Sequence, residues 1–339
     1  MSRISMLHGS GGQATADLIR DVFAKEFGNL YLNTMNDSAI VPGGADLAVT
    51  TDSFVVNPLF FRGGNIGRLS VAGTVNDLLT CGAVPEYITA GFILEEGLDI
   101  EDLKRIVHSM EQTAEEAGVF IVSGDTKVVE GSGGLYINTS GVGFVPAGMR
   151  ISPRMVEKGD AVLLTGTLGD HHAAILSSRM SIENEISSDC APLNSIVRSL
   201  INEGVPVHAI RDITRGGLAT VLSELCAQSG KSSLIEEDRI PVTPAVKDFC
   251  GLLGLDPLYM GNEGKLVMIL PEEATEDALS IIKKSHYGEN AVRIGNILSY
   301  DDEEEMDLHP DGGKLLVRTS VGGIRHLTAL QGEGLPRIC

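Results

Sequence analysis

Hydrophobic and polar positions in the first half of the chain follow the periods of strands and helices in alternation. In residues 65–82, apolar side chains recur near every 3.6 positions, which predicts a helix. In residues 99–117 the pattern is amphipathic, with Asp99 as a helix N-cap and Gly118 as its stop. A further helix is predicted at 15–25. Strands are predicted at 46–56, 86–94, 119–122 and 135–145.

A polar, turn-rich stretch at 146–160 separates this half from a second half in which the pattern begins again. Strands are predicted at 161–164, 205–210, 264–270, 291–298 and 314–319. Helices are predicted at 171–179, 217–228 and 275–285. Strands that alternate with helices in both halves indicate two α/β or α+β domains, which we assign to residues 1–150 and 151–330.

The charge balance limits the partners of such a protein. The 339 residues include 26 basic and 46 acidic side chains, a net charge of −20, which disfavours duplex DNA and anionic membranes. Aromatic residues are only 4% and tryptophan is absent, which argues against base-stacking surfaces. Any polyanion handled here is therefore expected to be small and to arrive with a divalent metal.

The chain has neither an apolar run of about 18 residues nor an N-terminal apolar signal segment. Its five cysteines are an odd number with no CxxC pair, which indicates reduced thiols in the cytoplasm rather than disulfides or structural zinc. We expect Cys81, Cys226 and Cys250 to be buried as small hydrophobic residues, whereas Cys190 lies in a polar segment and indicates nothing.

Candidate chemistry lies in acidic residues at strand and helix ends, because the chain lacks a P-loop, a dinucleotide-binding fingerprint and a nucleophile elbow. One such aspartate is more often a turn or helix cap than a ligand. Several of them flanked by Gly, Ser, Thr or Asn indicate carboxylates that share Mg²⁺ ions and so neutralise a triphosphate. The candidates are Asp37, Asp52, Asp77, Asp125 and Asp212.

Each of four other elements has both a functional and a purely structural interpretation. Lys127 is either a phosphate-binding charge or a surface lysine. The backbone amides of Arg215-Gly216-Gly217 suit an anion. Those of His8–Gly12, in particular Gly11 and Gly12, suit an anion as well, and the alternative is that this segment is only an N-terminal arm. Glu263 lies between glycines, as a ligand contact or a turn carboxylate. We interpret His8, His171 and His172 as ordinary solvated or capping histidines, and the acidic run at 301–307 as a solvated loop.

The chain ends in Pro336-Arg-Ile-Cys339, after two glycines. This ending is not a prenylation signal. The nine residues after Leu330 span about 30 Å when extended, and a thiol on such an arm is a nucleophile that can carry a group between sites. The residues alone leave open that Cys339 is an incidental last residue.

At this point the sequence resembles a known family. The ending Pro-Arg-Ile-Cys is similar to the C-terminal signature of the HypE family of hydrogenase maturation factors, the carbamoyl dehydratases. Internal blocks that look like those of this family, and in looser form like those of the aminoimidazole ribonucleotide synthetase-like superfamily, are 8–12, 36–38, 51–58, 123–127, 211–217 and 261–264. Selenophosphate synthetase usually carries Cys and Lys in its N-terminal glycine loop, whereas this chain has Ser10 and Gln13.

The resemblance implies a two-domain α/β (α+β) fold of the aminoimidazole ribonucleotide synthetase type. Residues 1–150 would bind ATP and dimerise through a barrel shared by two subunits. Residues 151–330 would complete the nucleotide cleft, and 331–339 would form an arm. The implied reaction is ATP-dependent dehydration of an S-carbamoyl group on Cys339 to a thiocyanate. This reaction supplies cyanide to the iron of [NiFe]-hydrogenase, with the carbamoyltransferase HypF and a HypC–HypD complex as partners in the cytoplasm.

The resemblance also distributes roles among the candidates. Asp37, Asp52, Asp77 and Asp212 would hold Mg²⁺–ATP, with Asp37, Asp77 and Asp212 on the metal. Lys127 would meet the phosphates, Asp125 and Thr126 would lie beside them, and Gly11, Gly12, Gly216 and Gly217 would offer backbone groups. Glu263 would take the nitrogen proton and Cys339 would carry the substrate. The alternatives are a selenophosphate synthetase-like ATP enzyme and a non-catalytic protein whose tail docks a partner.

Overall fold

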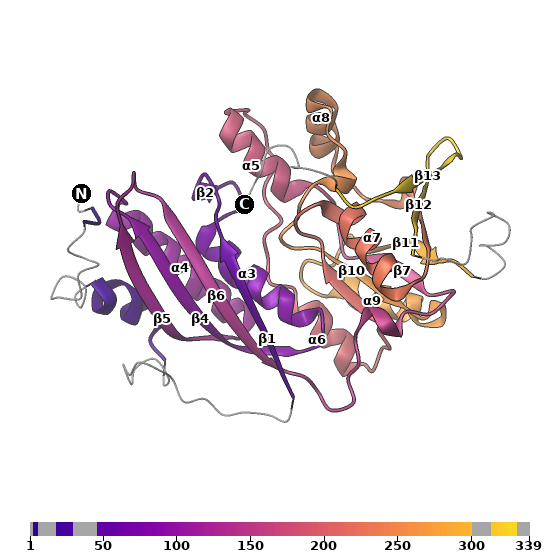
Figure 1. The fold of residues 1–339 in the computed structure, drawn as a ribbon, viewed down its shortest axis with the longest axis horizontal. Coiled ribbons are helices and arrows are strands. Elements are labelled where there is room, and N and C mark those ends of the chain that lie inside the picture. The colour runs from indigo at the N-terminus through magenta and orange to yellow at the C-terminus, as the bar shows by residue number, and fades with distance from the viewer. Residues whose placement is uncertain (1–2, 6–17, 30–45, 300–312, 331–339) are drawn as a thin grey trace.

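The computed structural model describes residues 3–5, 18–29, 46–299 and 313–330, and it has two sheets side by side (Figure 1). The first sheet has the strand order β1-β6-β4-β5, with β4 and β5 parallel and the other pairs antiparallel. Its strands are β1 (Leu47–Phe54), β4 (Val84–Glu95), β5 (Phe120–Val129) and β6 (Leu135–Phe144). The short pair β2 (Phe60–Phe61) and β3 (Gly64–Asn65) precedes the first long helix.

Two helices cover one face of this sheet. In α3 (Ile66–Leu79), the side chain of Asn65 caps the N-terminus by accepting from the amides of Gly67 and Arg68. In α4 (Ile100–Ala117), Asp99 caps the start and Gly118 follows the end with φ 69°, which confirms both predicted boundaries. A short helical segment, η2 (Ile19–Ala24) and α2 (Lys25–Phe27), packs on α4.

The second sheet has seven strands in the order β13-β12-β9-β11-β7-β10-β8. They are β7 (Ala161–Leu164), β8 (Ala209–Asp212), β9 (Ser233–Glu236), β10 (Leu266–Leu270), β11 (Val292–Ile297), β12 (Leu315–Arg318) and β13 (Ile324–Leu327). The helices are α5 (Asp170–Met180), α6 (Asn194–Asn202), α7 (Gly217–Ser229), α8 (Pro244–Leu253) and α9 (Thr275–Lys284). Single-turn helices lie at Pro153–Met155, Glu237–Arg239, Pro257–Tyr259 and Glu272–Ala274.

The two halves are joined through α3. The Asn76 side chain donates to the carbonyl of Ala191 (3.0 Å) and accepts from the amide of Leu193 (2.9 Å). Arg68 donates to the carbonyl of Cys190 (2.7 Å) and pairs with Glu116 of α4. Asn76 is 3% exposed, so its amide is satisfied by the backbone of the other half and fixes the two sheets relative to one another.

The structure corrects several expectations. The block Ser123–Lys127 lies inside β5 and not after it, because the strand continues to Val129. The sequence analysis did not predict the strands β9 and β13 or the helices α6 and α8. Cys226 and Cys250 are buried as predicted, whereas Cys81 is only partly buried and Cys190 is buried. No helix in the described ranges is long and apolar enough to cross a bilayer.

Candidate active site

Four of the predicted carboxylates converge where the two sheets meet. Asp52 lies on the helix-facing side of β1, and Asp77 lies in the last turn of α3. Asp212 is the last residue of β8. Glu263 lies in the turn before β10 and is 9% exposed. The charges of Asp52, Asp77 and Asp212 each raise the pKa of the Glu263 carboxyl, so these groups share one electrostatic environment.

Asp77 carries the clearest electrostatic signature of this crowding. Burial and then the neighbouring charge of Asp212 raise its pKa from 3.8 to about 7. The hydroxyl of Thr50 donates to its Oδ2 at 2.8 Å, which opposes the shift. The pKa values of Asp52 and Asp212 are also raised, in both cases mainly by burial. A cluster of buried carboxylates with raised pKa values is suited to a cation.

Glu263 is held by its backbone. Its amide donates to Oδ1 of Asp189 at 3.0 Å, and its carbonyl accepts from the amide of Ala191. A Cβ at Gly264 would lie 1.9 Å from the carbonyl oxygen of Asp189, so only glycine fits beside the 189–191 segment. Burial, then the charge of Asp189, raises the pKa of Glu263 well above its ordinary value. The Glu263 carboxyl is therefore a strong proton acceptor once it is ionised.

Three basic side chains lie near the carboxylates. Lys265 pairs with Asp189 at 3.6 Å, and both side chains are almost fully buried. The positive charge of Arg211 opposes the rise in the pKa of Asp77 and of Asp212. The positive charge of Arg215 does the same for Asp52. These cations border the acidic cluster on the side of β8, where the phosphates of a nucleotide would need positive charge.

The two glycines at the start of α7, Gly216 and Gly217, are required by the local backbone conformation and packing. Both Gly216 and Gly217 have positive φ, 78° and 64°. A Cβ on Gly217 would lie 2.5 Å from the carbonyl oxygen of Leu258. The amide of Gly217 donates to the carbonyl of Thr214. The freely available Gly217 amide that the sequence suggested is thus already paired in this structure.

The block on β5 lies apart from the cluster within one chain. Asp125 and Lys127 are exposed, and the Lys127 Nζ donates to Asp125 at 3.0 Å. The strand register puts Asp125 level with Ser53 on the face away from the helices, whereas Asp52 and Thr126 point toward the helices. Because β1 and β5 are opposite edges, three strand spacings of ~4.8 Å, about 14 Å, separate them along the sheet.

Asp189 is the principal group that sequence reasoning missed. It lies in a segment without a motif, and its Oδ2 is buried without a hydrogen-bond donor. The expectation for His171 and His172 was wrong, because both are buried. Burial lowers the pKa of His171 to about 4, and its Nδ1 contacts the hydroxyl of Ser188 at 2.8 Å. The remaining predicted residues lie outside the described ranges: Gly11, Gly12, Asp37, Cys339, His8 and the 301–307 run.

Comparison with known proteins identifies the family of this chain. The model of the AIR synthase related protein N-terminal domain matches residues 35–145, and that of the corresponding C-terminal domain matches 157–306. The carbamoyl dehydratase HypE of Cupriavidus necator is 48% identical over 99% of this chain and 95% of its own length. The chain belongs to the HypE family of carbamoyl dehydratases. HypE of Escherichia coli is 42% identical, with both chains fully covered.

Solved HypE structures agree with the fold. A crystal structure of the hydrogenase maturation protein HypE in complex with ATP has 45% identity and a TM-score of 0.93, covering 98% of this chain and 99% of that one. A HypE chain from a HypE–HypF complex has 42% identity and a TM-score of 0.78, covering 92% and 99%. Thiamine-monophosphate kinase of Stenotrophomonas maltophilia, at 19% identity and a TM-score of 0.64, shares the fold alone. The predicted two-domain aminoimidazole ribonucleotide synthetase-like fold is confirmed.

Proposed function

We propose that this protein uses ATP to dehydrate an S-carbamoyl group on Cys339 to a thiocyanate, which supplies cyanide for the iron of [NiFe]-hydrogenase. The observation that carries the proposal is the convergence of Asp52, Asp77, Asp212 and Glu263 between the two sheets, in a chain 48% identical to a carbamoyl dehydratase. A relative of the same fold is bound to ATP, which supports a nucleotide in this cleft.

The reaction needs an oxygen to become a leaving group. The carbamoyl oxygen attacks the γ-phosphorus of ATP, the bond to the bridging oxygen breaks, and ADP leaves. The nitrogen then gives one proton to a carboxylate of the chain and the other to the departing phosphate as the C–O bond breaks, and a carbon–nitrogen triple bond remains on sulfur. The chain's part is to align the carbamoyl oxygen with the phosphorus and to accept one proton.

Asp77 and Asp212 fit a magnesium ion, with Asp37 as a further proposed ligand. Hard carboxylate oxygens are the donors that Mg²⁺ prefers, and the pKa of Asp77 is raised by burial and then by the like charge of Asp212, both of which a bound cation would offset. The bound ion would neutralise charge on the phosphates during transfer. Asp52 orients the nucleotide on the β1 side, and the amides of Gly11, Gly12 and Gly216 are proposed phosphate contacts.

Glu263 is the proposed proton acceptor. The amide of Glu263 is fixed by Asp189, and Asn76 donates to its carbonyl, so the side chain projects from a rigid turn. Its carboxyl would face the carbamoyl nitrogen in the bound substrate. Cys339 holds the substrate through sulfur and takes no part as acid or base.

We also propose a homodimer built through the open face of the first sheet. The side chains on this face form an apolar surface that a monomer rarely exposes. Its large exposed members are Leu47, Val49, Val84, Ile93, Phe120, Val129 and Tyr136. Two such faces packed about a two-fold axis would bury them.

The dimer gives the Lys127 block its role. Asp125 and Lys127 share the open face with the apolar residues. Closing a barrel from two sheets brings β5 of one subunit to β1 of its partner, and Lys127 then reaches the phosphates bound near the partner's Asp52. Thr126 and Asp125 line the same edge.

Partners and domain limits follow from the same proposal. A relative is found in a complex with HypF, which supports HypF as the carbamoyl donor here. A HypC–HypD complex is the proposed acceptor, in the cytoplasm. Residues 1–150 are proposed as the ATP-binding and dimerising domain, 151–330 as the domain that completes the cleft, and 331–339 as the arm.

The deciding experiment is intact-protein mass spectrometry after incubation with HypF, carbamoyl phosphate and ATP. We expect the mass of the C-terminal peptide to increase by one carbamoyl group. When ATP is supplied to this protein, the modified peptide should then lose one water, ~18 Da. Nucleotide needed by the transferase is removed before the second step, so that the dehydration is tested separately. An unmodified Cys339 in the presence of active transferase would refute the proposal in favour of a docking tail.

A further inference from the structure

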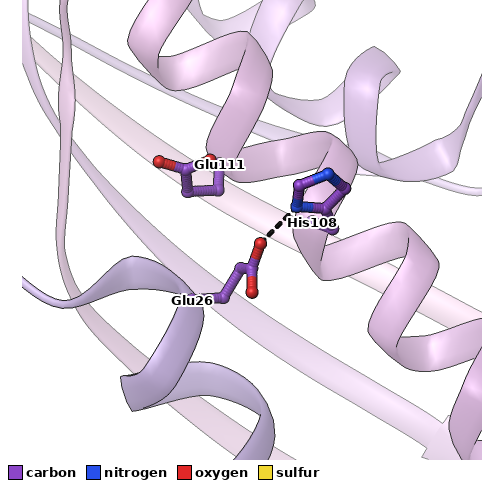
Figure 2. Close-up of side chains that lie close together, drawn as sticks. All are labelled: Glu26, His108 and Glu111. Carbon is purple, nitrogen blue, oxygen red and sulfur yellow. Dashed lines mark hydrogen bonds and ion pairs between the residues drawn. The ribbon is translucent and has the colours of Figure 1, made fainter.

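A second group of potential ligands lies on the helix side of the first sheet, away from the carboxylate cluster. Glu26, His108 and Glu111 each offer one ligand atom, and these atoms lie within 4.8 Å of one another, with Glu26 in contact with His108 and Glu111 beside them (Figure 2). His108 and Glu111 are one turn apart on α4. Glu26 comes from α2, 82 residues earlier, and its Oε1 contacts Nδ1 of His108.

Packing fixes the two elements that provide these ligands. Phe23 and Phe27, on either side of Glu26, are each 7% exposed, and the Phe23 ring lies 4.8 Å from that of Phe92 in the sheet. The side chain of Asn29 donates to the carbonyl of Ile121 at 2.8 Å and fixes the end of the segment. The ligands therefore converge from elements whose positions are set independently of any ion.

Negative charge is concentrated at this group. Glu26, Glu111 and the neighbouring Glu115 place three carboxylates beside the single imidazole of His108. In the described part of the chain, no lysine or arginine is ion-paired with Glu111 or Glu115, since Lys104 and Arg105 pair with other carboxylates of α4. A cavity of about 220 Å³ beside the group is lined by Glu26, Glu111 and Glu115, with room for water ligands.

We propose that Glu26, His108 and Glu111 bind a first-row divalent cation, with Zn²⁺ as the occupant, and that the ion fastens α2 to α4. One imidazole and two carboxylates with water in the remaining position suit Zn²⁺. The imidazole separates this site from the all-oxygen cluster proposed for Mg²⁺. The ion takes the place of the direct contact between His108 and Glu26 and bridges the two side chains.

The test uses the full-length protein after removal of metals with a chelator. Titration with Zn²⁺ followed by calorimetry, and with Co²⁺ followed by its visible spectrum, is expected to give one equivalent with a Kd of roughly 10⁻⁶ M or below. His108→Ala and Glu111→Gln each weaken binding about tenfold or more. Two controls bind as the unchanged protein does: His326→Ala, on exposed β13, and Asp77→Asn, in the carboxylate cluster.

A second measurement keeps the proposal testable if a variant perturbs the helix. Zn²⁺ is expected to slow amide exchange in residues 18–29 of the unchanged protein and not in His108→Ala. The proposal is overturned if no stoichiometric binding occurs, or if binding survives His108→Ala and Glu111→Gln. Loss of binding in Asp77→Asn alone would move the ion to the carboxylate cluster and equally overturn it.

Discussion

The hydroxyl of Thr50 donates to Oδ2 of Asp77 at 2.8 Å, linking β1 to the last turn of α3. The bond holds Asp77, whose pKa is about 7, against β1, the strand that also carries Asp52. The sheet and the helix that packs on it therefore present their acidic groups to the second domain in a fixed arrangement.

The first prediction concerns the stability of the nucleotide-free protein. The folded pKa of Asp77, about 7, exceeds the unfolded value near 3.8, so the folded state binds the extra proton between these values. The free energy of unfolding should fall as pH rises from about 4 to about 7. Above this range it should stay at its lower value, because Asp77 is then ionised in both states. Asp77→Asn should remove that slope and stabilise the protein at pH 8 by about 1–3 kcal/mol. Urea denaturation at several pH values measures this, and parallel profiles for both proteins would contradict it.

The second prediction concerns proton transfer. Glu263→Gln keeps the volume and the backbone contact to Asp189 but removes the basic oxygen. Nucleotide binding should be retained, while thiocyanate formation falls by roughly 10²-fold or more. Glu203→Gln, on an exposed residue after α6, is the matched control. Normal thiocyanate yield from the Glu263→Gln protein would exclude an essential base at this position.

The third prediction tests the shared site. Lys127→Ala should slow phosphoryl transfer by roughly 100-fold or more, whereas Lys247→Ala, on exposed α8, should not. When Lys127→Ala and Asp52→Asn subunits are mixed, one site in each heterodimer recovers both wild-type residues if Lys127 acts on its partner's site. Activity is then expected to return to about a quarter of the wild-type value, from random pairing. Mixing without recovery would place Lys127 and Asp52 in the same subunit's site.

The fourth prediction concerns the apolar face of the first sheet. Val49, 69% exposed, lies on edge strand β1 within the proposed interface, where a buried charge would be unpaired, so Val49→Glu should yield a monomer. Leu252, 73% exposed on α8, is an equally exposed residue outside this face, and Leu252→Glu should leave the dimer intact. Sedimentation at several concentrations separates the two outcomes. A wild-type protein that sediments as a monomer would remove the interface altogether.

The fifth prediction concerns the carrier. Cys339→Ala should bind nucleotide normally and form no carbamoylated or cyanylated product, because sulfur is the attachment point. Cys81→Ala, which removes a partly buried thiol of the first domain, should behave as wild type. Mass spectrometry of the C-terminal peptide decides the question, and product formed by the Cys339→Ala protein would disprove the carrier role.

Sequence reasoning located most of the acidic cluster for a physical reason. Asp77 follows Asn76, Asp212 lies two residues before Thr214, and Glu263 lies between Asn262 and Gly264, in short blocks with Gly, Thr or Asn that the sequence analysis singled out. Asp189 also has small neighbours, Ser188 and Cys190, but it lies outside these blocks, and its partner Glu263 is 74 residues away, so its role depends on a long-range contact that no local pattern encodes. The burial of His171 was missed for the same reason.

Asn76, described above as the link between the halves, has a consequence for how the protein is made. Its partners, Ala191 and Leu193, lie more than 110 residues later in the chain, as do Asp212 and Glu263. A ribosome that has released only the first half has therefore made Asp52 and Asp77 without the further carboxylates, Asp212 and Glu263, that repel them. This added repulsion arises when the second half docks, so the last stage of folding is the one that a bound cation and nucleotide would favour most.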